Sequence, residues 1–263
     1  MSKTESVTES VKYYNWGPVA IPAGDQMVHR VGPLGLVFRK ISNEIWIAAD
    51  RTQIEHPDPE TLVWSRWALK KDSVPIEVMP MMPDRQVVVR PEYPFMLSPG
   101  AEVRIYTRIP VWVGVYALES KRHLLMEIPT VMLSKTWFGD FIEGTMCYWI
   151  STTARRLITD DIFQSHTAIS TLHIKNESNS DLKIDKLGIR VDRLSLFDKD
   201  GQLWTDEMDI RYQGEEQHSE ITMKGKPPSE VKEARLLTSP RDPVKKSFAE
   251  RTFRIFKDIP GFN

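Results

Sequence analysis

The residues best suited to chemistry gather in one short stretch near the middle of the chain. Residues 133–140 read Leu-Ser-Lys-Thr-Trp-Phe-Gly-Asp, so an aromatic pair stands directly before a glycine and a carboxylate. Asp140 and Glu143 could act as an acid and base pair in a glycosidase-like site. Trp137 offers a flat ring of the kind that packs against a sugar or another apolar ligand. This stretch predicts a ligand site in a loop between strands, formed by Trp137, Phe138, Asp140, Glu143, Tyr148 and Arg155.

The same stretch also has a purely structural interpretation. Large aromatic side chains usually end in a core, so Trp137 and Phe138 could cap the junction between two domains. Asp140 would then shape a turn and form an ion pair with Arg155. Two carboxylates three residues apart are common, and the sequence leaves both interpretations open.

The remaining reactive residue types point to structural roles. Cys147 stands between Met146 and Tyr148, a setting typical of a packed thiol in a buried strand. The six histidines lack the spacing that places two imidazoles on one metal ion. Asp198-Lys-Asp-Gly201 lacks the closing glutamate of a calcium loop and predicts a hairpin turn. We therefore expect neither a metal nor another cofactor, and the sequence carries no recognised catalytic motif.

Composition narrows the class of protein further. The 263 residues carry 35 basic and 36 acidic side chains, a net charge of -1, which argues against a dedicated nucleic-acid binder. A single cysteine, no apolar leader in the first thirty residues and no long apolar run predict a cytoplasmic protein without a transmembrane segment.

Apolar residues at every second position predict that β-strands position these groups. This alternation is clearest at Val103, Ile105 and Ile109, with charged or polar residues between them, and it resumes at Ser170, Leu172 and Ile174. Helical spacing is scarce, although residues 153–163 weakly suggest a helix. The pattern predicts an all-β protein of two antiparallel sandwich domains, at residues 1–155 and 165–225, the second of them Ig-like.

The C-terminal tail, residues 240–260, has a different pattern. Its apolar residues fall on one stripe at helical spacing, and residues 241–257 contain six basic and two acidic side chains. This predicts an amphipathic helix that docks on its own domain or on a partner, with an anionic membrane surface as the weaker option. The residues expected to make the partner contact are Phe248, Arg251, Phe253 and Phe256.

The block from Ile128 to Asp140, with Glu143-Gly144 and Cys147-Tyr148 after it, resembles the centre of an uncharacterised archaeal and bacterial family known as a domain of unknown function. The stretches Ile174–Ser178 and Leu203–Glu207 are similar to the second half of that family. Some of its members are associated with mechanosensitive channels. The resemblance implies an accessory role and names no substrate or catalytic residue.

These observations favour a non-catalytic cytoplasmic protein that acts through a protein partner or through self-association. The alternative is a small-molecule or glycan-binding module, or a hydrolase, that uses the loop around Trp137 and Asp140.

Overall fold

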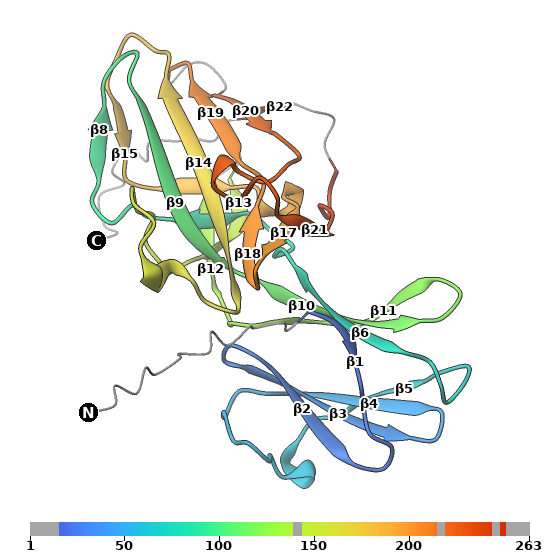
Figure 1. The fold of residues 1–263 in the computed structure, drawn as a ribbon. Coiled ribbons are helices and arrows are strands. Elements are labelled where there is room, and N and C mark those ends of the chain that lie inside the picture. Colours follow the sequence, from blue (N-terminus) through green and yellow to red (C-terminus); the bar gives the residue numbers. More distant parts are fainter. Residues whose placement is uncertain (1–15, 139–143, 215–218, 244–247, 251–263) are drawn as a thin grey trace, which may run out of the picture.

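The structure, a computed structural model, consists of two β-sandwiches stacked end to end (Figure 1), which confirms the all-β prediction. It describes residues 16–138, 144–214, 219–243 and 248–250. Most strand pairs are antiparallel, as predicted, but β13 with β7 and β14 with both β18 and β19 are parallel.

The lower sandwich is built from two four-stranded sheets. One has the order β1 (Gly17–Val19), β6 (Ile76–Met81), β10 (Trp112–Leu118) and β11 (Arg122–Pro129). The other has the order β2 (Gln26–Val31), β3 (Leu34–Ile41), β4 (Glu44–Asp50) and β5 (Ser65–Ala68). Alternate residues such as Leu36, Phe38 and Ile47 point inward and are fully buried between the two sheets, as period-two patterning requires.

The upper sandwich has one large sheet centred on β14 (Thr167–Asn176). Strand β9 (Glu102–Pro110) pairs with one edge of β14, and β18 (Gln202–Thr205) and β19 (Met208–Tyr212) share the other edge. The sheet continues outward through β17 (Leu196–Lys199) and β21 (Arg235–Thr238) on one side, and through β20 (Ser219–Met223) and β22 (Phe248–Glu250) on the other.

A smaller layer covers the inner face of this sheet. It comprises β12 (Ser134–Phe138), β13 (Thr145–Trp149), β7 (Val87–Val89) and β16 (Leu187–Ile189), with β8 (Phe95–Leu97) and β15 (Leu182–Ile184) as a separate pair. Side chains from both layers, among them Val87, Ile105 and Leu172, form one buried cluster. Four short 3-10 turns complete the described elements, at Pro59–Thr61, Asp160–Ile162, Val191–Arg193 and Ser229–Val231.

The chain crosses between the sandwiches at several points. Only Val111 separates β9 of the upper sandwich from β10 of the lower one, and its amide donates to the His166 carbonyl at 3.0 Å. Gly32 lies so close to His166 that an added Cβ would come within 2.3 Å of the imidazole. Each core is therefore assembled from segments that alternate along the chain, and the predicted domain boundaries at residues 155 and 165 stay a prediction.

Neither helical prediction is confirmed in the described residues. Residues 153–163 contain a single 3-10 turn, Asp160–Ile162, because the backbone before it is held as an extended clip. In the tail, Phe248–Glu250 forms β22, which pairs with β20, so pairing to a sheet edge overrides the helical period there. No helix is present in the described part of residues 240–260. Residues 244–247 and 251–263, including Arg251, Phe253 and Phe256, lie outside the described residues.

Candidate functional site

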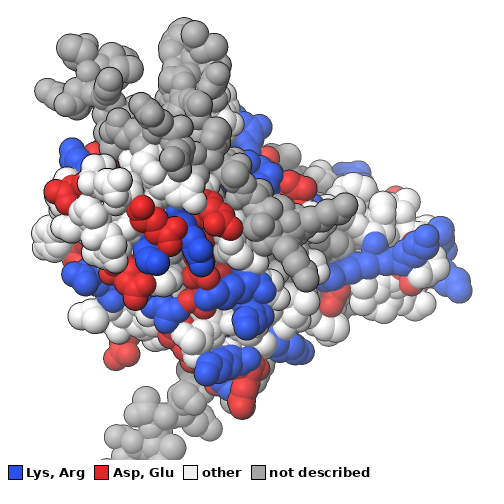
Figure 2. Space-filling model, turned by 90° about the horizontal axis from the view of Figure 1, so that it is seen from above, with Lys and Arg blue, Asp and Glu red and all other residues white. Residues whose placement is uncertain are grey.

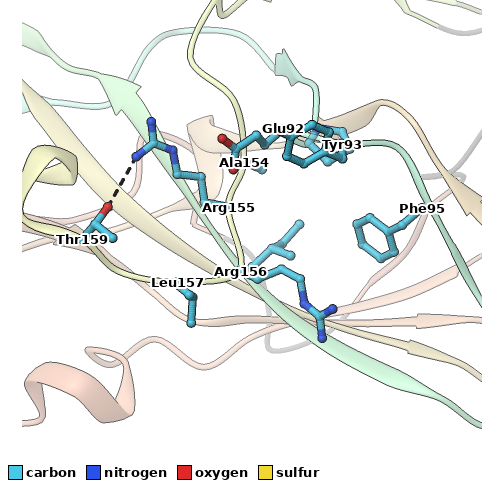
Figure 3. Close-up of a pocket in the computed structure, with 10 residues that line it drawn as sticks. Glu92, Tyr93, Phe95, Ala154, Arg155, Arg156, Leu157 and Thr159 are labelled. Carbon is cyan, nitrogen blue, oxygen red and sulfur yellow. Dashed lines mark hydrogen bonds between the residues drawn. The ribbon is translucent and has the colours of Figure 1, made fainter.

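The upper sandwich contains a pocket of about 560 Å³ between the segment around residues 91–95 and the segment at residues 154–159 (Figure 3). That volume lies in the range of small-molecule sites. Ile105 of β9, which is 1% exposed, also lines it. The full lining is Pro91, Glu92, Tyr93, Phe95, Ile105, Ala154, Arg155, Arg156, Leu157 and Thr159.

Backbone hydrogen bonds fix the wall that carries the charged residues. The Ala154 amide donates to the Arg90 carbonyl at 2.7 Å, and the Glu92 amide donates to the Ala154 carbonyl at 2.8 Å. On the other side, Arg155 and Tyr106 exchange two backbone hydrogen bonds of 2.7 and 2.8 Å. Residues 154 and 155 are thus clipped between β9 and the segment before β8, so the pocket is preformed rather than assembled on a free loop.

Large apolar side chains surround the opening. Tyr93 is 77% exposed and Leu157 is 73% exposed, and Phe95 is half-buried beside them. Such exposure is costly in water unless a ligand or partner covers these groups. The apolar wall can therefore contribute binding energy.

The two adjacent arginines of the pocket have different environments. Arg155 forms an ion pair of 2.6 Å with Asp161 and contacts the Thr159 hydroxyl at 3.4 Å. Hydrogen bonds from Thr159 and then Arg155 hold the pKa of Asp161 below its usual value. Figure 3 shows Arg156 directed the opposite way, toward the side of Phe95. Arg156 has no ion-pair or hydrogen-bond partner among the described residues, so its guanidinium is available to an anion.

The structure separates the site residues predicted from the sequence. Arg155 lines the pocket, whereas Trp137 and Phe138 belong to β12 and Tyr148 to β13. Trp137 is 47% exposed and Phe138 is 5% exposed, as expected for neighbours on opposite faces of a strand. Asp140 and Glu143 lie outside the described residues. Phe248 lies in β22.

Tyr148 and Cys147 of β13 have structural roles. The Tyr148 hydroxyl donates to Asp84 at 2.9 Å. Burial, followed by this hydrogen bond, raises the pKa of Tyr148. Cys147 is fully buried, as the packed-thiol interpretation predicts, and burial raises the pKa of its thiol to about 11. The thiol is therefore protonated at neutral pH and is a poor nucleophile.

Sequence reasoning missed Glu92, Tyr93, Phe95, Arg156 and Leu157. The pocket joins two segments about sixty residues apart, and no local pattern reveals that they meet. The adjacent arginines at 155 and 156, placed where the strand pattern stops, were the one usable signal.

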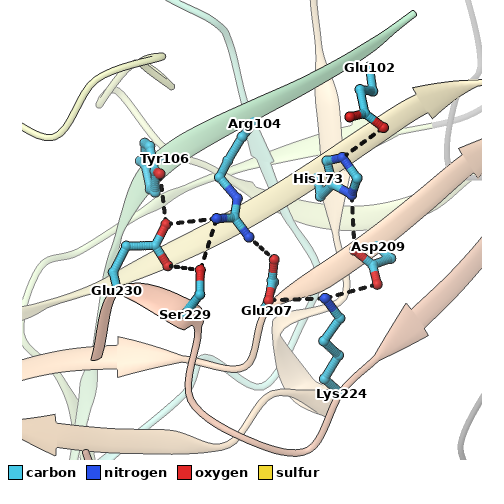
Figure 4. Close-up of polar contacts among 9 residues, drawn as sticks. All are labelled: Glu102, Arg104, Tyr106, His173, Glu207, Asp209, Lys224, Ser229 and Glu230. Carbon is cyan, nitrogen blue, oxygen red and sulfur yellow. Dashed lines mark hydrogen bonds and ion pairs between the residues drawn. The ribbon is translucent and has the colours of Figure 1, made fainter. Parts of the chain in front are cut away.

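A network of charged residues covers part of the outer face of the large sheet (Figure 4). Glu207, only 5% exposed, contacts Arg104 and receives a bond of 3.0 Å from Lys224. Arg104 also reaches Glu230 at 3.1 Å. Seen from above, acidic and basic side chains lie next to one another over this sandwich (Figure 2).

The rest of the network engages a phenol, an imidazole and two further carboxylates. The Tyr106 hydroxyl donates to Glu230 at 2.7 Å. Burial, then that hydrogen bond, raises the pKa of Tyr106 to about 12. His173 lies between Glu102 and Asp209, at 3.4 and 3.2 Å. Each carboxylate of the network already faces a cation or a hydrogen-bond donor, so the network has a structural role. Its bonds from Arg104 hold the Ser229–Val231 turn against β9.

Two features are absent from the described residues, a metal centre and a membrane-spanning helix. No group of three or more His, Cys, Asp and Glu side chains is placed to hold a metal ion. In the same part of the chain, no helix has the length and apolar character needed to cross a membrane.

Comparison with known proteins gives one match. A family model described as "Protein of unknown function (DUF432)" matches residues 15–257. No curated protein and no solved structure matches the chain. The resemblance to a family of unknown function is thereby confirmed, and the association with mechanosensitive channels stays an expectation.

Proposed function

We propose that this chain, which belongs to the DUF432 family of proteins of unknown function, is a non-catalytic binding protein whose pocket takes a small anion with an apolar or aromatic part. The observation that carries the proposal is the unpartnered Arg156 guanidinium at a pocket whose other side presents Tyr93 and Phe95. The cytoplasmic location and the accessory role expected from the sequence belong to the same proposal.

The charges of the lining support a ligand with a single negative charge. Arg155 and Arg156 oppose Glu92 in the lining, and Asp161 already neutralises Arg155. Arg156 is therefore the cation left for the ligand, and Glu92 in the same lining disfavours a ligand that carries more than one negative charge. A guanidinium binds a carboxylate or sulfonate through two parallel N–H donors, which gives orientation as well as affinity.

The polar groups of the pocket favour binding over catalysis. Thr159 and Asp161 resemble a nucleophile and its general base, because the Thr159 hydroxyl donates to the Asp161 carboxylate. The lowered pKa of Asp161 makes that carboxylate a weak base, so it activates the hydroxyl poorly. The hydrogen bond is better explained as support for the Arg155 ion pair.

The experiment compares two fluorescent probes of the same shape, the anion anilinonaphthalene sulfonate and its neutral analogue N-phenylnaphthylamine. The wild-type protein is expected to bind the anion more tightly, and Arg156→Gln should remove that preference by a factor of ~10, because a charge-assisted hydrogen bond contributes about 1.5 to 3 kcal/mol. Tyr93→Ala should weaken both probes.

The matched control is Arg211→Gln, which removes an exposed arginine of β19 that does not line the pocket and should leave both affinities unchanged. Equal anion preference in the wild-type and Arg156→Gln proteins would refute the proposal.

A further inference from the structure

The outer face of the β2–β5 sheet carries a tryptophan between two arginines. The Arg66 guanidinium lies 3.8 Å from the centroid of the Trp46 ring, and that of Arg39 lies 5.7 Å from it. The ring is held in place because its Nε1 donates to Glu44 at 2.9 Å and because Trp64 packs edge-on at 6.1 Å. Both guanidinium groups therefore have a fixed aromatic surface to stack on.

These cations lack acidic partners. Among the described residues, no carboxylate forms an ion pair with Arg39 or Arg66, and the nearby Glu44 accepts from the Trp46 indole. A cation–π contact occupies the face of a guanidinium and leaves its N–H donors in the plane for another acceptor. This surface consequently presents unsatisfied positive charge in a defined orientation.

The backbone beside these residues is also available. Strand β5 is the last strand on this side of its sheet (Figure 1). The Leu69 amide donates to the Asn43 carbonyl at 2.7 Å, and hydrogen-bonded pairs alternate along an antiparallel ladder. The pairs of Arg66 with Trp46 and of Ala68 with Glu44 are thus of the non-hydrogen-bonded kind. Their register directs the Arg66 and Ala68 backbone groups toward the open edge and brings the Arg66 side chain close to Trp46.

We infer that the edge of β5 binds an extended acidic segment of a partner protein, which adds as a further strand. Carboxylates at alternate positions of that segment would lie on the face of Arg66. Those farther along would meet Lys71, since Lys70 already pairs with Glu119 at 3.2 Å. Main-chain hydrogen bonds to β5 supply affinity, and the cations select acidic side chains.

Charge argues against two of the occupants that this chain itself could supply. Pairing of β5 with β5 of a second copy would bring the arginines of both copies together, which like-charge repulsion disfavours. The C-terminal tail carries six basic and two acidic residues over positions 241–257, so the same surface repels it. A separate acidic partner is the occupant that fits.

The test uses fluorescein-labelled peptides of twelve residues, one alternating Glu and Thr and the other alternating Gln and Thr, with binding followed by anisotropy. The full chain is expected to bind the acidic peptide at least about tenfold more tightly, and the difference should shrink as salt rises to about 0.5 M. Arg66→Gln should reduce affinity for the acidic peptide by a factor of ~5 or more. Arg211→Gln, which removes an exposed arginine of β19 in the upper sandwich, should not change it.

A second variant separates strand addition from simple charge attraction. Ala68→Pro removes an amide that faces the open edge, a position where proline is tolerated, so the fold should persist with an unchanged thermal midpoint. Loss of acidic-peptide binding by this variant is expected. Full binding by Ala68→Pro, or tighter binding of single-stranded oligothymidylate than of the acidic peptide, would overturn the inference.

Discussion

Substitution of Glu207 by glutamine tests whether the charged network of the upper sandwich holds that sandwich together. Glu207 is 5% exposed and its two carboxylate oxygens face Arg104 and Lys224. Glutamine has almost the same shape, but its amide places donors where one of these two cations needs an acceptor. The change therefore isolates the charge and one hydrogen bond from the volume of the side chain.

The expected loss in free energy of unfolding is about 1.5 to 2 kcal/mol. Hydrogen bonds to charged groups contribute roughly 1.5 to 3 kcal/mol, and the partner side chains are 35% and 31% exposed, so solvent screening favours the lower end. For a chain of this size, each kcal/mol shifts the thermal midpoint by about 2 to 4 °C. Urea unfolding followed by tryptophan fluorescence should give the same free-energy difference with an unchanged slope.

The control is Glu233→Gln, because the Glu233 side chain is 89% exposed and its ion pair with Lys199 spans 3.9 Å. It should change stability by less than about 0.5 kcal/mol. A double-mutant cycle of Glu207→Gln with Lys224→Met should give a coupling above about 0.5 kcal/mol. Equal losses for Glu207→Gln and Glu233→Gln, together with additive effects in the cycle, would refute the reasoning.

Two other predictions follow from buried groups. The folded-state pKa of Tyr106 is about 12 and its ordinary value is 10.0, so the stability that its protonated hydroxyl contributes is complete below pH 10 and is lost as pH rises toward 12. Tyr106→Phe should reduce this loss of stability in urea midpoints measured from pH 9 to 12. The same loss in the variant and in the wild-type protein would contradict the assignment. Phe138→Ala should lower the free energy of unfolding, measured by urea unfolding, by about 3 to 5 kcal/mol. Trp137→Ala should lower it clearly less, because that ring is 47% exposed. Equal losses of stability in the two variants would show that the two rings share one environment.

Patterning of the sequence predicts the strands well, but it predicts less well what covers them. The alternation around Val103 and Ile105 correctly places those residues in the core. The same alternation assigns Tyr106 to solvent, yet Tyr106 packs with Ile162, Ile169 and Trp204 under segments that arrive from elsewhere in the chain. Burial by a non-local segment leaves no trace in a period-two pattern.

The tail and the candidate pocket show the same limit. The apolar residues around Phe248 do follow a helical period, but the open edge of β20 offers backbone hydrogen-bond partners. Residues 248–250 pair with that edge as β22. The pocket depends on two segments far apart in the sequence, and only the adjacent arginines at 155 and 156 hinted at one of its walls. The expected site around Asp140 and Glu143 stays a prediction.

The alternation of the chain between the sandwiches sets the order in which the protein can fold on the ribosome. The lower sandwich needs β11, so its strands are complete only once Pro129 has left the exit tunnel. By then β9 has already been made, while its partner β14 begins at Thr167. A nine-residue strand rich in apolar side chains therefore waits without its partner during synthesis, and such a strand invites aggregation. Chaperones should therefore bind the nascent chain mainly while residues 130–167 are being synthesised. Synonymous codon changes that slow translation in this range should lower the yield of folded protein more than the same changes placed after residue 223.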